Sequence, residues 1–155
     1  MLQGQLEKKG IEIMLKVVVD TSVVLKWIPG KGEEQVGEAR QLYKWIVDRK
    51  IEAWAPTFML VEALNILIKK RKVENKDAIG GMKILMKAGI RFEDFNTTTI
   101  SEIGKLMREW DVSAYDALFL EQAGRLGCKV ITYDEKLLTN KNMATRIKDV
   151  LVMEN

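Results

Sequence analysis

Short runs of β-branched residues alternate along the chain with segments in which apolar side chains recur every three or four residues. The first run, at residues 17–19, is apolar without interruption, which is typical of a strand covered on both faces. This alternation predicts an α/β fold with a parallel sheet. The pattern places strands at residues 17–19, 51–54, 90–95, 129–132 and 150–152, and helices at residues 33–50, 57–71, 75–89, 99–110 and 113–127.

Five strands joined by helices predict a three-layer α/β/α sandwich around a five-stranded parallel sheet. In the helix over residues 99–110, Ile100, Ile103, Met107 and Trp110 share one face, which we expect to be buried. The chain shows no internal repeat or linker, so residues 14–155 are expected to form a single domain. Residues 1–13 are polar and without pattern, which predicts a loose extension, and Met1 and Met14 are both candidates for the natural start.

The composition fits a folded globular protein without a membrane span. The 155 residues are 47% hydrophobic and 30% charged, with a formal net charge of +3, which suits one domain and excludes a disordered chain. No run approaches the roughly 18–20 apolar residues of a membrane span, and no signal peptide is visible, so no membrane partner is expected. Cys128 is the single cysteine and cannot form an internal disulfide, which indicates the reducing cytoplasm.

The sequence contains no histidine. This excludes Ser-His-Asp and Cys-His catalysis, histidine-ligated zinc and histidine general bases. A single cysteine also excludes a cysteine-rich zinc site. Any chemistry must therefore use carboxylates, hydroxyls, lysines or metals bound through oxygen.

Two aspartates follow predicted strands. Asp20 ends the first strand and precedes Thr21 and Ser22, and Asp134 follows the strand over residues 129–132. Ligands of open α/β sheets bind beyond the carboxyl ends of the strands, so both positions suit a functional site. Each aspartate also suits a simpler role, Asp20 as the N-cap of the next helix and Asp134 as a turn or cap residue.

Glu62 lies in a segment that is otherwise almost entirely apolar. Residues 58–68 read FMLVEALNILI, with Glu62 and Asn65 as the polar members. A helix that is apolar on all sides is expected to be buried, and burying an unpaired carboxylate costs several kcal/mol or forces its protonation. Asn65, three residues further, shares the face of Glu62 and joins the candidate site. The alternative is a salt bridge from Glu62 to a lysine or arginine.

Asp116 points along the apolar face of its predicted helix. It lies within roughly 60° of Phe119, Leu120 and Ala123 when successive residues are about 100° apart. Its alternative role is local, because Ser113 and Asp116 have the spacing of a capping box. The two roles are compatible, since a first-turn carboxylate also lies near the positive end of the helix dipole.

Together, these four carboxylates indicate one acidic pocket at the carboxyl edge of the sheet. Two carboxylates about 4 Å apart repel each other by roughly 4 kcal/mol at an effective dielectric constant of 20. Several such pairs would rival the ~5–15 kcal/mol stability of a whole domain, so a positive group must sit among them or some must stay protonated. Oxygen ligands alone favour a hard ion, Mg²⁺ or Mn²⁺.

The segments around these acids resemble a PIN domain: VVVDTSVVLKW, VEALNIL with Glu62, SAYDALFLEQA with Asp116 and VITYDEKL with Asp134. Within that family, the size and the YDA and TxD contexts are most similar to the VapC toxins of toxin–antitoxin pairs. The resemblance implies a Mg²⁺- or Mn²⁺-dependent ribonuclease with a PIN-like five-stranded parallel sheet. It also implies a homodimer and inhibition by a bound VapB-type antitoxin.

The resemblance further implies a role for each site residue. Asp20, Glu62, Asp116 and Asp134 match the acidic quartet that binds the metal and carries catalysis. Ser22 or Thr21 matches the hydroxyl after the first acid, and Thr132 the polar residue before the last. In the implied mechanism, the metal lowers the pKa of a bound water and neutralises the scissile phosphate, and the resulting hydroxide attacks phosphorus.

Several alternatives stay open. One is a PIN-fold RNA-processing nuclease without an antitoxin, and another is a non-catalytic RNA- or protein-binding module of the same fold. A haloacid-dehalogenase-like phosphotransferase would need a second aspartate where Ser22 stands, and a dinucleotide-binding domain would need a glycine-rich turn after the first strand. The basic cluster at residues 69–72 either grips phosphates or only complements a helix end. Trp27 either stacks on a base or packs in the core.

Overall fold

The central strand β1 (Leu15–Val19) is buried on both faces, since Val17, Val18 and Val19 are at most 2% exposed. The computed structural model describes residues 14–28 and 36–152, so the predicted extension over residues 1–13 lies outside the described residues. The other strands are β2 (Ile51–Pro56), β3 (Arg91–Glu93), β4 (Lys129–Ile131) and β5 (Ala144–Thr145).

All neighbouring strands pair in parallel, in the order β3-β2-β1-β4-β5. In the register, Val18 of β1 lies opposite Trp54 of β2 and Val130 of β4. The predicted α/β fold with a five-stranded parallel sheet is therefore confirmed. The strand order reverses between β1 and β4, and in such sheets the crevice beyond this reversal is where ligands bind.

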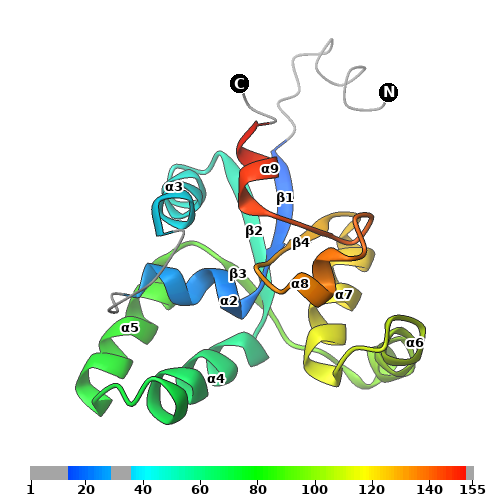
Figure 1. The fold of residues 1–155 in the computed structure, drawn as a ribbon, viewed down its shortest axis with the longest axis horizontal. Helices are drawn as coiled ribbons and strands as arrows, with labels where there is room; N and C mark the ends of the chain where they lie inside the picture. The colour runs from blue at the N-terminus through cyan, green and yellow to red at the C-terminus, as the bar shows by residue number, and fades with distance from the viewer. Residues whose placement is uncertain (1–13, 29–35, 153–155) are drawn as a thin grey trace.

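Helices cover both sides of the sheet (Figure 1). On one side lie α3 (Val36–Val47), α4 (Phe58–Asn65) and α5 (Asn75–Lys87), and on the other lie α6 (Ile100–Trp110) and α7 (Ala114–Leu126). The short elements are α2 (Thr21–Val24), the 3₁₀ turns η1 (Leu25–Trp27) and η3 (Thr97–Thr99), the π-helical turn η2 (Ile66–Lys70), α8 (Glu135–Leu138) and α9 (Ile147–Leu151). In the described part of the chain, no helix is long and apolar enough to cross a membrane.

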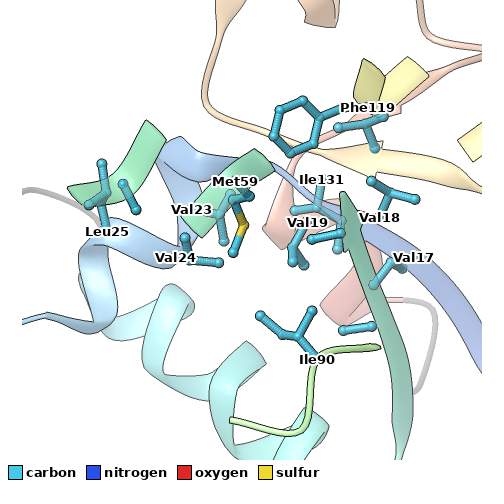
Figure 2. Close-up of a cluster of buried hydrophobic side chains, with 14 of the residues drawn as sticks. Val17, Val18, Val19, Val23, Val24, Leu25, Met59, Ile90, Phe119 and Ile131 are labelled. Carbon is cyan, nitrogen blue, oxygen red and sulfur yellow. The ribbon is translucent and has the colours of Figure 1, made fainter. Parts of the chain in front are cut away.

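One apolar cluster joins the elements that carry the candidate site (Figure 2). Val23 of α2, Met59 of α4 and Phe119 of α7 are each 0% exposed and lie in this cluster with the valines of β1. Burying such side chains contributes about 1.5–3 kcal/mol each. Because α2 directly follows Asp20, the packing that stabilises the fold also fixes the first three predicted acids.

The last strand lies at Ala144–Thr145, so the prediction of a strand at residues 150–152 is wrong. Ile147 and Val150 are buried three residues apart on one face of α9, whereas Val152 is 71% exposed. Packing of this helical face overrides the preference of β-branched residues for strands. The real strand has two residues at the edge of the sheet and carries no apolar run that a sequence pattern would detect.

The apolar face of α6 is buried only at its centre. Ile103 and Leu106 are buried, but Ile100 is 53% and Trp110 is 38% exposed, so the prediction that both are buried is wrong. The reason is that α6 packs mainly against α7 and lies at the outside of the molecule (Figure 1). A single neighbouring helix is too narrow to cover both ends of the face.

Candidate active site

An open cleft of about 460 Å³ is lined by all four predicted acids. Asp20 follows β1, Glu62 lies within α4, Asp116 is in the first turn of α7 and Asp134 directly precedes α8. The ends of β1 and β4 are neighbours at one edge of the sheet, and α4 and α7 approach this edge from opposite faces (Figure 1). Folding thus brings together four carboxylates that are far apart in the sequence.

The carboxylate of Asp20 is buried, with 7% of the residue exposed. Its Oδ2 atom accepts hydrogen bonds from Ser22 Oγ at 2.7 Å and from Thr132 Oγ1 at 2.8 Å. Burial raises the pKa of Asp20, the two hydroxyls lower it in part, and the negative charge of Asp116 raises it again. Asp20 stands at the N-cap position of α2 but makes no side-chain cap hydrogen bond, so helix capping does not explain its position.

Hydroxyl groups connect the acids to one another. Thr132 Oγ1, which donates to Asp20, also accepts from the backbone N–H of Asp134 at 2.9 Å. Ser22 Oγ accepts in the same way from the backbone N–H of Tyr133 at 3.2 Å. These bonds hold the end of β1 against the end of β4. Thr132 and Ser22 therefore orient Asp20.

Replacing Thr132 with valine nearly preserves the volume of a side chain that is 0% exposed but removes this hydroxyl. We expect Thr132→Val to lower the free energy of unfolding by about 1–3 kcal/mol, because the buried Asp20 carboxylate and the Asp134 N–H both lose a partner. The loss should be larger at pH 8 than at pH 5, since the hydrogen bond favours ionised Asp20. Urea unfolding at both pH values measures it. Thr132→Ser should stay close to wild type, and an equal loss in both variants would contradict the role of the hydroxyl.

Glu62 accepts a short hydrogen bond from Thr21 Oγ1 through its Oε2 atom. Within the described part of the chain it makes no ion pair, so the alternative of a salt bridge is not realised there. Burial raises the pKa of Glu62, the Thr21 hydroxyl lowers it, the charges of Asp20 and Asp116 raise it and Lys70 lowers it. At neutral pH, the protonated and the ionised forms of Glu62 are therefore closer in free energy than the two forms of an exposed glutamate.

The helix that carries Glu62 is not buried on all sides, which corrects the prediction. Met59 and Ala63 are buried, but Val61 is 62% exposed and Asn65 is also exposed. α4 packs on one side against α2 and α5 and leaves its other side open. Asn65 does not line the cleft, so its expected place beside Glu62 in the site is not supported by the geometry.

Asp116 and Asp134 combine their local roles with a place in the cleft. The backbone N–H of Asp116 donates to Ser113 Oγ at 3.1 Å, so Ser113 caps α7 while the Asp116 carboxylate lines the cleft. Asp134 Oδ1 accepts from the backbone N–H of Lys136 at 2.8 Å and caps α8. Both helix-cap alternatives are thus partly realised, and neither removes the carboxylate from the cleft.

The donor set of the cleft consists of oxygen atoms, which suits a hard divalent cation. The hydrogen-bond partners of Asp20, Glu62 and Asp134 are hydroxyl or backbone donors, which carry no positive charge. Over residues 14–28 and 36–152, no three carboxylates or thiols are grouped closely enough to bind one ion directly. Mg²⁺ commonly binds one or two carboxylates and keeps several waters, so the residues fit a hydrated ion rather than a closed cage of protein ligands.

The cleft also contains residues that sequence reasoning did not assign to it. Lys26, Arg71 and Tyr133 line it together with the four acids. Lys26 is a single charge within the apolar run VVLKWI, a signal comparable to that of Glu62. Arg71 belongs to the basic cluster at residues 69–72, but nothing in the sequence distinguishes it from its neighbours. Trp27 is buried and its Nε1 donates to Ala39 O at 2.7 Å, which supports the core alternative.

Comparisons with known proteins identify the family and the fold of the chain. The family model described as the PIN domain matches residues 17–141. PAE2754 from Pyrobaculum aerophilum is 21% identical with a TM-score of 0.65, covering 90% of this chain and 94% of that one.

Two further solved structures share the fold. The sarcin-ricin loop cleaving toxin VapC20 from Mycobacterium tuberculosis is 17% identical with a TM-score of 0.65, covering 79% of this chain and 93% of that one. VapBC2 from Rickettsia felis, bound to a DNA fragment from its promoter, is 14% identical with a TM-score of 0.65, covering 85% and 98%. At these identities the likeness shows the fold, and no curated protein matches the chain.

Proposed function

Because the chain belongs to the PIN domain family, whose members are generally nucleases, we propose that it is a divalent-metal-dependent endoribonuclease and the toxin of a VapBC-type pair. The observation that carries this proposal is the cleft at the reversal of strand order, which four carboxylates line. A chain without histidine can hydrolyse a phosphodiester through carboxylates and a bound cation. The cytoplasm is the proposed compartment.

In this mechanism Mg²⁺ or Mn²⁺, when bound, lowers the pKa of water and offsets the charge of the scissile phosphate. Asp20, Asp116 and Asp134 would hold the hydrated ion, with one or two of them bound to it directly and the others through its waters, and Ser22 and Thr132 keep Asp20 in one orientation. Glu62, whose pKa is raised, is suited to accept the proton of the attacking water at its carboxylate. Thr21 keeps that carboxylate turned toward the cleft.

The proposed partners are single-stranded RNA, a second copy of the chain and a VapB-type antitoxin. Support for the antitoxin comes from structural neighbours whose descriptions name toxin–antitoxin assemblies, including a complex from Klebsiella pneumoniae and VapBC2 from Rickettsia felis. Exposed apolar side chains such as Val61 and Tyr115 next to the cleft acids offer surface for a protein partner. An RNA-processing nuclease without an antitoxin is the alternative, and a small DNA-binding protein encoded next to this chain would decide against it.

Metal removal tests the proposal directly. Purified protein is incubated with labelled single-stranded RNA in Mg²⁺ or Mn²⁺, in EDTA, and in EDTA followed by excess metal. We expect cleavage only with metal, and an increase in Tm of about 5–10 °C when the ion is present at roughly 100 times its Kd. Cleavage that persists in EDTA, or a Tm that does not respond to millimolar metal, would contradict the proposal. Binding of RNA without cleavage in any condition would favour the non-catalytic module.

A further inference from the structure

Two cationic side chains stand in the same cleft as the four carboxylates, Lys26 from η1 and Arg71 at the end of η2. Building on the proposed ribonuclease function, we propose that Lys26 and Arg71 form a subsite for an RNA phosphate next to the one that is cleaved. They would act as positioning residues that bind the RNA backbone, while the carboxylates carry the reaction.

Arg71 links the end of η2 to η1. Its Nη1 donates to the backbone carbonyl of Leu25 at 3.4 Å, and Leu25 directly precedes Lys26. The contact places the guanidinium beside η1, although 46 residues separate Arg71 from Leu25. Both cations therefore line the cleft around the same turn of the chain.

Lys26 is held in place by an aromatic ring. Its Nζ lies 4.8 Å from the centroid of the Tyr133 ring, a distance at which a cation–π contact is attractive. Tyr133 stands between Thr132, which orients Asp20, and Asp134, so this contact fixes Lys26 relative to the acids. A side chain that is already ordered loses less entropy when it binds a ligand, which favours a binding role.

The positive charges of Lys26 and Arg71 in the cleft complement the negative charge of a phosphodiester. Four carboxylates would repel the negative backbone of RNA, so a substrate needs positive groups close to the reacting phosphate. An arginine presents a planar fork that matches phosphate oxygens, and a lysine presents a compact point charge. Contacts of this kind position the strand but carry no sequence information. The subsite is therefore expected to bind any single-stranded RNA.

The members of the basic cluster at residues 69–72 differ in their position relative to the cleft. Of residues 69–72, only Arg71 lines the cleft, whereas Lys69 and Lys72 are exposed outside it. Lys70 acts on Glu62 through its charge but does not line the cleft. Lys69 is thus a matched comparison, with a similar charge and a nearby position but no place in the subsite.

The test measures RNA binding without cleavage. Lys26→Met, Arg71→Met and Lys69→Met are each combined with Asp116→Asn, and the Kd for a fluorescein-labelled 20-nucleotide single-stranded RNA is measured by anisotropy from 50 to 300 mM NaCl. We expect Lys26→Met and Arg71→Met to weaken binding about 5–20-fold at low salt and to reduce the slope of log K against log salt by about 0.7 each. Lys69→Met should change Kd less than about 2-fold. Arg71→Lys, which keeps the charge, should restore the slope, and Tm values verify that each variant is folded.

Each other outcome has a distinct meaning. An unchanged Kd in both cleft variants, or an equal loss of affinity in Lys69→Met, would overturn the subsite. Cleavage of RNA by the wild type would in that case still support the ribonuclease function. If both variants bind RNA normally but Lys26→Met and Arg71→Met lower kcat when Asp116 is intact, the cations serve the carboxylates and not the substrate, and the subsite is again overturned. Weakened binding in a protein that never cleaves RNA would support the subsite and reject the ribonuclease function.

Discussion

Asp116→Asn is expected to reduce metal-dependent RNA cleavage by about 10³-fold or more, equivalent to roughly 4 kcal/mol of activation free energy. Asparagine has the shape of aspartate but no charge, and Asp116 is one of the acids proposed to hold the ion. The helix should be unaffected, because Ser113 Oγ accepts from the backbone N–H of Asp116 and not from its side chain. A gel assay with labelled RNA and Mn²⁺ measures the change.

The same variant should be at least as stable as the wild type without metal. The charge of Asp116 contributes to the raised pKa of both Asp20 and Glu62, so its removal relieves repulsion in the cleft. With metal, the stabilisation that the wild type gains should be reduced. Asp48→Asn, at an exposed turn after α3, is the matched control and should retain full cleavage. Undiminished cleavage by Asp116→Asn would refute the proposed role, and a variant that unfolds without metal would contradict the expected stability.

Phe119→Ala should lower the free energy of unfolding by about 3–5 kcal/mol. Phe119 is among the largest fully buried side chains, at 0% exposure, and lies on α7 in the buried apolar cluster (Figure 2). Truncation leaves a cavity that the surrounding sheet and helices fill only in part. For a domain with a total stability of about 5–15 kcal/mol, such a loss is a large fraction of the whole.

Urea unfolding followed by tryptophan fluorescence measures this loss, and Phe95→Ala serves as its control. Phe95 is 52% exposed, so its truncation should change the free energy of unfolding by about 0.5 kcal/mol or less. Similar losses in both variants would show that α7 is not anchored by Phe119. Well below its Tm, Phe119→Ala should still cleave RNA, because none of the acids is altered.

Sequence periodicity predicted most of the fold because it reflects local burial. The apolar run at residues 17–19 identified the central strand, and helical spacing identified α3 through α7. The predictions that are wrong concern segments in which few residues pack against a single neighbouring element. The two-residue strand β5 carries no pattern, and the ends of α6 extend beyond the helix that covers its middle.

Within the candidate site, the sequence alone determined which side chains are chemically out of place. Acids at two strand ends and in two apolar helices stand out because burying an ionised group is unfavourable, and the absence of histidine restricts the chemistry to oxygen ligands. These are properties of residue type and of neighbours along the chain, so no coordinates are needed to read them.

Tertiary structure alone decided which groups meet. The hydroxyl of Thr132 reaches Asp20 across 112 residues, Arg71 and Lys26 enter the cleft, and Asn65 does not. Such encounters depend on strand order and on the angle at which helices approach the sheet, because hydrogen bonds and charge–charge interactions act over a few ångströms in space regardless of distance along the chain.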